Sequence, residues 1–151
     1  IWENLIGTSY FRKPLSISGI ISMKNIVKHS KDLKEIYDIR TPGVFIKVQS
    51  LSGGNQQKVV IARELSEDPT LTIASQPTRG VDIGNIEAIH KKLVEIRDNG
   101  KAVLLISAEL DEVMSVADRV AVIYEGEIVA WVNPREVNQE QMGLYMAGIK
   151  D

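Results

Sequence analysis

A serine and two glycines stand directly before a strongly helical run in the middle of the chain, at Ser52, Gly53 and Gly54. Glycine has no Cβ, so the backbone at such a point can come close to a ligand. The first N–H groups of the following helix have no partner within it, and they can point at an anion. Residues 51–65 therefore suit a phosphate-binding helix N-terminus, although Ser-Gly-Gly alone also suits a loop that simply starts a helix.

Composition narrows the class of protein. The 151 residues are 44% hydrophobic and 25% charged, as in an ordinary globular domain. The formal net charge of −2 argues against a dedicated nucleic-acid surface. No cysteine is present, so disulfides and thiolate metal sites are excluded, and we expect no metal site. Because the sequence begins with Ile1 and not with methionine, we expect it to be a piece of a longer polypeptide.

The spacing of apolar residues changes along the chain. A helix is predicted over 23–37, with Ile26, Leu33, Ile36 and Tyr37 on one face. Beyond residue 66, short apolar runs typical of buried parallel strands alternate with amphipathic helices. This alternation predicts an α/β fold with parallel strands flanked by helices. The predicted strands are 71–74, 103–106 and 120–123 with a hairpin partner at 128–132, and the other helices are 54–66, 86–98, 109–116 and 137–147.

The full string from Leu51 to Arg63 resembles the signature motif of ATP-binding cassette (ABC) ATPases, because Gln57, Lys58, an apolar triplet and Ala-Arg follow the glycines. The resemblance implies an α-helical, signature-bearing subdomain over 1–66, truncated at its start. It also implies that 67–151 is the C-terminal part of a P-loop NTPase (RecA-like) core. Cassettes of this family pair head to tail, so the residues implied to bind nucleotide in trans are Leu51, Ser52, Gly53, Gly54 and Gln57.

The catalytic positions of the family carry other residues in this chain. Where the family has Asp-Glu-Pro-Thr (Walker B), this sequence has Ser75-Gln76-Pro77-Thr78, so the Mg²⁺-assisting aspartate and the water-polarising glutamate are both replaced. Ala108 takes the place of the switch histidine. Loss of a general base typically lowers a rate by about 10²–10⁴-fold. We therefore expect no intact catalytic residue here, and a local site that hydrolyses nucleotide poorly.

An aspartate, two histidines and a set of lysines each have a structural interpretation beside the functional one. Asp82 matches the D-loop aspartate that bridges two ATPase domains, and it also suits a helix N-cap. His29 and His90 are expected to have structural roles and not catalytic ones. The lysines at 24, 28, 31 and 34 fit a solvated helix face better than a binding patch.

No Gly-x-x-x-x-Gly-Lys-Ser/Thr loop occurs in the sequence. The family resemblance implies that the intact polypeptide is an ATPase that uses ATP with Mg²⁺. Because this phosphate-binding loop is missing, residues 1–151 alone are expected to be inactive and to bind no nucleotide tightly.

The stretches 55–58 and 77–84 resemble the second cassette of tandem-cassette importers for nucleosides and ribose-type sugars, and the carboxylate-free Ser75-Gln76 favours nucleosides. This resemblance implies a peripheral protein at the cytoplasmic face of the membrane. The implied partners are a second ATPase cassette, transmembrane permease subunits and, indirectly, a solute-binding lipoprotein, with no nucleic acid. The alternatives are a non-catalytic interaction module and a soluble ABC ATPase of DNA repair or translation.

Overall fold

The computed structural model describes residues 1–81 and 83–149. It separates into two compact units. The first unit contains residues 1–72 and 78–87, and the second contains residues 73–77 together with the chain from residue 88 onward. The subdomain boundary that we place at residue 66 from the sequence remains a prediction.

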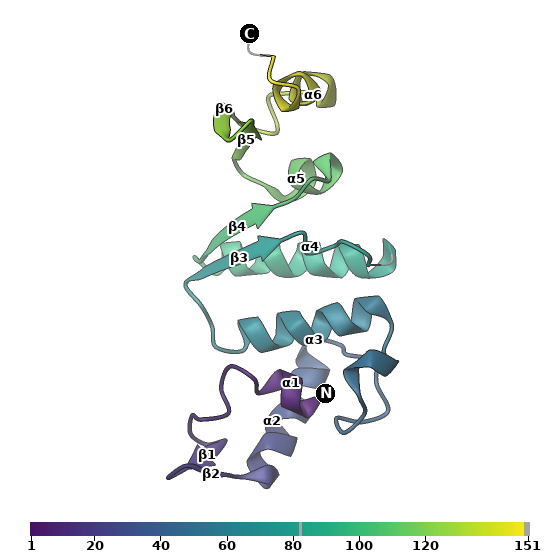
Figure 1. The fold of residues 1–151 in the computed structure, drawn as a ribbon, viewed down its shortest axis with the longest axis vertical. Helices are drawn as coiled ribbons and strands as arrows, with labels where there is room; N and C mark the ends of the chain where they lie inside the picture. Colours follow the sequence, from purple (N-terminus) through teal and green to yellow (C-terminus); the bar gives the residue numbers. More distant parts are fainter. Residues whose placement is uncertain (82, 150–151) are drawn as a thin grey trace. The chain divides into compact units, whose positions relative to one another are not determined.

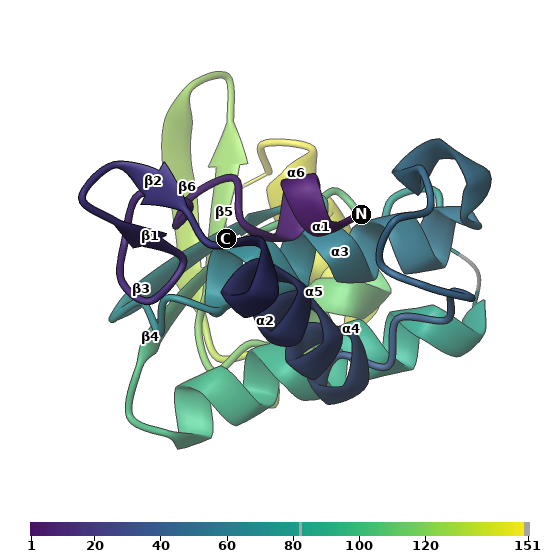
Figure 2. The same ribbon diagram turned by 90° about the horizontal axis from the view of Figure 1, so that it is seen from below.

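Helices dominate the first unit, and α1 lies against both α2 and α3 (Figures 1 and 2). The unit also contains a short two-stranded hairpin. The elements are α1 (Trp2–Leu5), β1 (Ser16–Ile17), β2 (Ile20–Ile21), α2 (Met23–Ile36), the 3₁₀ helix η1 (Val48–Ser50) and α3 (Gly53–Leu65).

The predicted apolar face of α2 is confirmed at Ile26 and Leu33, which are buried, and is wrong at Ile36, which is 67% exposed. At about 100° per residue, Ile36 lies about 80° around the helix from Ile26, whereas Leu33 lies only about 20° away. Tyr37 follows the helix and packs, partly buried, against the core. Lys24, Lys28 and Lys31 are exposed, and Lys34 is half-buried.

Two hydrophobic clusters hold this unit together. The larger joins the three helices to the segment after α2, and the smaller anchors the hairpin. Their buried members are Ile1, Leu5, Leu33, Ile39, Val59 and Ala62 in the first, and Ile6, Leu15 and Ile26 in the second.

The β1–β2 hairpin is not among the elements that the sequence predicts. Its strands are two residues long, paired as Ser16 with Ile21 and Ile17 with Ile20. Ser18 and Gly19 both have positive φ, 53° and 80°, as a tight hairpin turn requires. Strands this short have no measurable alternation, so periodicity cannot reveal them.

The rest of the chain has the predicted order of elements, with ends within three residues of those expected. These elements are β3 (Leu71–Ser75), α4 (Ile83–Asp98), β4 (Ala102–Ile106), α5 (Leu110–Val116), β5 (Val120–Tyr124), β6 (Glu127–Val132) and α6 (Gln139–Met146). The core of the second unit forms around Val120, Val122 and Met142. As predicted, α4 ends before Gly100, which has a φ of 78° and so suits the left-handed residue that commonly follows a helix.

The predicted parallel strands are seen in β3 and β4, but among the described residues β5 does not join them as the prediction implies. β3 neighbours β4, and their arrows point the same way in Figure 1, but these two strands form a sheet of their own. β5 instead pairs antiparallel with β6, from Val120 opposite Val132 to Tyr124 opposite Glu127. The hairpin itself is confirmed, and Glu125 and Gly126 supply the positive φ values of its turn.

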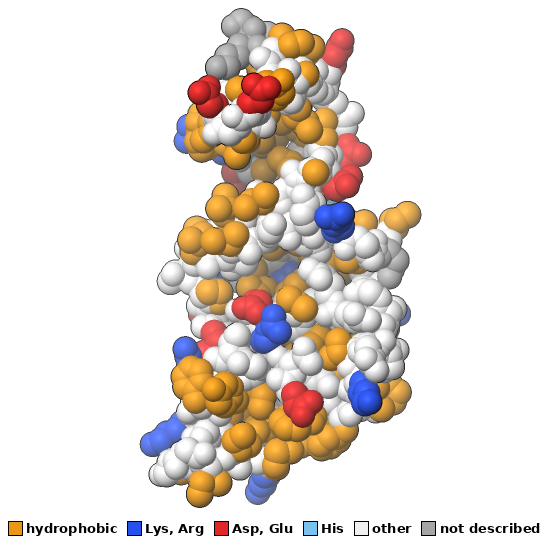
Figure 3. All heavy atoms as spheres, viewed as in Figure 1, with side chains coloured by type: hydrophobic (Ala, Val, Ile, Leu, Met, Phe, Trp, Pro, Cys, Tyr) orange, Lys and Arg blue, Asp and Glu red, His pale blue; other side chains and the backbone are white. Residues whose placement is uncertain are grey.

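The strands are also less buried than their apolar sequences predict. Along β3 and β4 exposed residues alternate with half-buried ones; Ile73 is 62% exposed and Ile106 is 49% exposed. Figure 3 shows hydrophobic side chains on the surface over β4. The side chains on one face of this two-stranded sheet are therefore exposed among the described residues.

Candidate phosphate-binding helix terminus

The N-terminus of α3 exposes a hydroxyl group and backbone. Ser52 is the N-cap residue, with extended dihedral angles of φ −61° and ψ 155°, and the helix starts at Gly53. Ser52 and Gly53 are exposed. The Ser52 side chain accepts no hydrogen bond from the helix backbone. The Ser52 side chain therefore does not occupy the N–H groups of the first turn, which suits a helix terminus that takes an outside acceptor.

Tight packing explains the glycine at position 54 and revises the interpretation of the motif. Gly54 is buried, and a Cβ there would lie 2.4 Å from Nδ2 of Asn85. A Cβ on Gly53 would lie 3.2 Å from the carbonyl oxygen of Gly80. The missing Cβ of Gly54 therefore serves contact with α4, and only Gly53 combines the missing Cβ with an exposed backbone.

Asn55, which the sequence analysis leaves out of the site, contacts Ser52 directly. Its Nδ2 donates to Ser52 Oγ over 3.0 Å, and its Oδ1 accepts from the backbone N–H of Arg40 over 2.7 Å. A serine followed three residues later by a polar side chain is the spacing of a capping box, which could have indicated this contact. Gln56 donates to the carbonyl of Leu51 over 2.8 Å.

An ion pair braces the segment before the motif against α3. Lys58 is buried, and its Nζ donates over 3.0 Å to both the carbonyl oxygen and Oδ2 of Asp38. This hydrogen bond and the positive charge of Lys58 are the main reasons why the pKa of Asp38 is lowered. Leu51 packs against the main core of the unit, and Gln57 is half-buried. Lys58 therefore ties the helix to the segment that also contacts Asn55.

The positions that replace the catalytic residues lie at the ends of β3 and β4 in the second unit. The backbone N–H of Gln76 donates to the carbonyl of Ile106 over 2.8 Å, so the two strand ends meet. Ser75 and Ala108 are exposed, and Gln76 has a φ of 49°. Ser107 Oγ accepts from the N–H of Glu109. None of the three replacement side chains is ionisable, and the described residues contain no cluster of acidic, His or Cys side chains that could hold a metal. Asp82 lies outside the described residues.

Both histidines are half-buried. His90 on α4 places Nε2 3.0 Å from Oε1 of Glu112 on α5. The Glu112 side chain is 3% exposed, and its buried Oε2 has no hydrogen-bond partner among the described residues. His29 has a lowered pKa because burial disfavours its charged form, and Asp32 partly opposes that effect. His90 therefore links two helices of the second unit, and its hydrogen-bond partner belongs to α5 and not to the strand ends.

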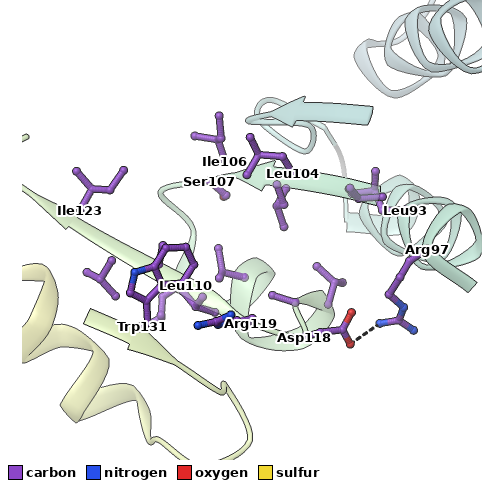
Figure 4. A pocket seen from close by; sticks show the side chains of 18 of the residues that line it. Leu93, Arg97, Leu104, Ile106, Ser107, Leu110, Asp118, Arg119, Ile123 and Trp131 are labelled. Atoms are coloured by element: carbon purple, nitrogen blue, oxygen red, sulfur yellow. Dashed lines mark hydrogen bonds and ion pairs between the residues drawn. The ribbon is translucent and has the colours of Figure 1, made fainter. Parts of the chain in front are cut away.

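A cavity of about 660 Å³ opens between β4, α5 and β5 within the second unit (Figure 4). Aliphatic side chains such as Leu104 and Ile106 form most of its wall. The charged groups at its rim are engaged. Arg97 pairs with Asp118 over 3.0 Å, and Arg119 stacks over Trp131 at 4.8 Å. The cavity is thus apolar, and it is unsuited to a phosphate.

No protein-family model matches the chain. It is 51% identical over 148 residues to the guanosine import ATP-binding protein NupO of Bacillus subtilis. It is 47% identical over 146 residues to the nucleoside import ATP-binding protein NupA of Lactococcus lactis, and 40% identical over 149 residues to the ribose import ATP-binding protein RbsA of Roseobacter denitrificans. These matches take in 97–99% of this chain but only 29% of each relative's length.

Solved structures share the fold. The ATP-binding cassette seen as a dimer in a post-hydrolysis state with ADP and Pi aligns with a TM-score of 0.66 and 26% identity, over 79% of this chain and 51% of that one. Another ATP-binding cassette of an ABC transporter aligns with a TM-score of 0.73 and 24% identity, over 98% of this chain and 61% of that one. Among the described residues, no helix is long and apolar enough to cross a membrane. The homologues of this chain are therefore ABC transporter ATP-binding proteins for nucleoside and sugar import, and its fold neighbours are ABC cassettes.

Proposed function

We propose that this chain is the C-terminal part of the second cassette of a nucleoside-importing ABC ATPase. The observation that carries the proposal is the 51% identity to a guanosine import ATP-binding protein over 98% of the chain. The second nucleoside importer, at 47% identity, exceeds the ribose importer at 40%. Because the chain spans 29% of these relatives, the activity belongs to the complete protein.

The N-terminus of α3 is the part that would meet ATP. Ser52 offers an exposed hydroxyl, and Gly53 offers exposed backbone beside it. These groups fit an anion, since hydrogen bonds to charged groups are worth about 1.5–3 kcal/mol each. Together with Leu51, Gly54 and Gln57, they would complete a site whose other half lies on the partner cassette. ATP itself supplies the phosphoanhydride bond whose hydrolysis drives import.

The local strand ends would form the weaker site. Ser75, Gln76 and Ala108 have no group that can accept a proton from water at neutral pH, so this site would bind nucleotide with little hydrolysis. The described residues offer no acidic cluster for Mg²⁺, so its ligands would come from elsewhere in the complete protein. Asp82 would bridge the two cassettes as the D-loop residue.

Open strand edges support the proposal that residues 67–151 are part of a P-loop core. β4 and β5 belong to different sheets, and the apolar cavity lies between them. A further strand from the complete cassette would fit there, pair with both edges and cover aliphatic side chains that are now exposed.

The same relatives support a proposal for the location and the partners of the complete protein. We place the complete protein at the cytoplasmic face of the membrane, working with permease subunits and, through them, with a solute-binding lipoprotein. A soluble ABC ATPase or a non-catalytic module is disfavoured, because the relatives named above are import proteins.

The response of ATP hydrolysis to different solutes tests the proposed function directly. In vesicles that contain the complete protein, its permease and its solute-binding protein, guanosine should raise ATP hydrolysis several-fold, because the proposed function couples hydrolysis to uptake of the solute. Ribose is the control and should leave the rate at its basal value. Stimulation by ribose alone would move the assignment to sugars, and no stimulation by any nucleoside or sugar would argue against import.

The weak site has its own test. Replacing Gln76 by Glu and Ala108 by His in the complete protein should raise turnover at least several-fold, because the pair restores a general base and a phosphate contact. The control is the single variant Gln76→Glu, which restores only the carboxylate and keeps Ala108. Single-turnover hydrolysis with nucleotide bound at both sites would measure the gain, and an unaltered single-turnover rate in the double variant would contradict this account of the site.

A further inference from the structure

The side chain of Asn55 makes two hydrogen bonds of opposite polarity. Its Oδ1 accepts from the backbone N–H of Arg40, which can only donate. That contact fixes the direction of the amide, so the Nδ2 group must face Ser52, where it donates to Oγ. The segment that holds Arg40 is itself tied to α3 through Asp38 and Lys58. The orientation of Asn55 is therefore set from outside the helix.

This arrangement decides what the Ser52 hydroxyl can do. A serine hydroxyl has one hydrogen to donate and two lone pairs that accept. Asn55 occupies a lone pair, so the hydrogen points elsewhere, and Ser52 is exposed. We propose that Asn55 is a positioning residue that keeps the Ser52 hydroxyl as a hydrogen-bond donor toward the terminal phosphate. This inference rests on the proposed function of Ser52.

The alternative is that Asn55 only braces the segment at Arg40 against α3. The two roles differ in the polarity of the contact with Ser52, and Asn55→Asp separates them. A carboxylate would still accept from the Arg40 N–H, so the brace would remain. Its second oxygen would accept the Ser52 hydrogen, and the hydroxyl would turn away from the phosphate.

We expect Asn55→Asp to lower kcat/KM for ATP in the complete protein by about 10- to 150-fold, the loss that one hydrogen bond to a charged group represents. Ser52→Ala should lower it by a similar factor. The melting temperature of Asn55→Asp should stay close to that of the natural protein, because both hydrogen bonds persist. If Asn55 were only a brace, Asn55→Asp would retain its activity. Asn55→Leu, which removes both hydrogen bonds, would then lose both stability and activity.

A double-mutant cycle removes the effect of the introduced charge. In the Ser52→Ala background, adding Asn55→Asp should lower kcat/KM for ATP by less than about 3-fold further, because no hydroxyl is left to turn. Repulsion between a new carboxylate and the phosphates would persist in that background. Gln56→Ala is the matched control: it removes a neighbouring amide that contacts Leu51 and not Ser52, so its effect should add to that of Ser52→Ala.

The outcomes distinguish the two proposals. Full activity in Ser52→Ala would overturn the phosphate-contact role of Ser52 and with it the proposed site. Reduced activity in Ser52→Ala, together with a harmless or additive Asn55→Asp, would leave the site in place and overturn the positioning role of Asn55.

Discussion

Replacing Ser52 by Arg should lower the ATPase activity of the complete protein by about 100-fold or more. Loss of one preorganised donor to developing charge typically costs 10²–10³ in rate, and the larger side chain would also cover the exposed backbone of Gly53. Steady-state hydrolysis by the complete protein with its permease is the measurement. Because Ser52 is exposed and its side chain makes no capping hydrogen bond to the helix backbone, the change in folding stability should stay below about 1 kcal/mol.

Two variants serve as controls for this result. Ser50→Arg introduces the same side chain two residues upstream, at another exposed serine, and should leave most of the activity. Ser52→Thr keeps a hydroxyl at the N-cap and should retain far more activity than Ser52→Arg. Activity of Ser52→Arg equal to that of Ser50→Arg would show that this helix terminus does not meet nucleotide.

The largest effect on stability is expected from His90→Ala, which should lower the free energy of unfolding by about 3 kcal/mol. The Glu112 side chain is 3% exposed, and His90 is the partner of its Oε1, whereas its buried Oε2 has no partner in the part of the chain that the structure describes. Removing one member of a buried polar pair typically costs about 3–5 kcal/mol, because the other member stays desolvated. His90 is 19% exposed, which places the expected value at the lower end of that range. Urea unfolding of the complete protein measures it.

A surface pair on the same helix provides the matched comparison. Lys92 and Glu95 form an ion pair with 27% and 57% exposed side chains, so Glu95→Ala should cost less than about 1 kcal/mol. The double variant His90→Leu with Glu112→Leu should recover most of the loss, because neither side chain then leaves a buried polar atom. Equal effects of His90→Ala and Glu95→Ala would mean that water reaches Glu112 and that the pair is unimportant for stability.

The elements that could be predicted are those with enough residues to show a period. α4 and its buried Ile89, Leu93 and Ile96 follow from helical spacing, and the end near Gly100 follows from its left-handed conformation. The β1–β2 hairpin could not be predicted, because two-residue strands show no alternation. The β5–β6 hairpin could be predicted, but its separation from the sheet of β3 and β4 among the described residues could not, because an apolar strand sequence does not specify which strand it pairs with.

The same division holds at the candidate site. Residue type and local conformation are enough to predict that Ser52-Gly53-Gly54 precedes a helix and that Ser75 and Gln76 carry no carboxylate. The contact of Asn85 that requires glycine at position 54, and the placement of Asn55 between Arg40 and Ser52, could be found only from the folded structure. Those contacts join segments far apart along the chain or depend on the direction of one amide group, and packing in three dimensions sets both.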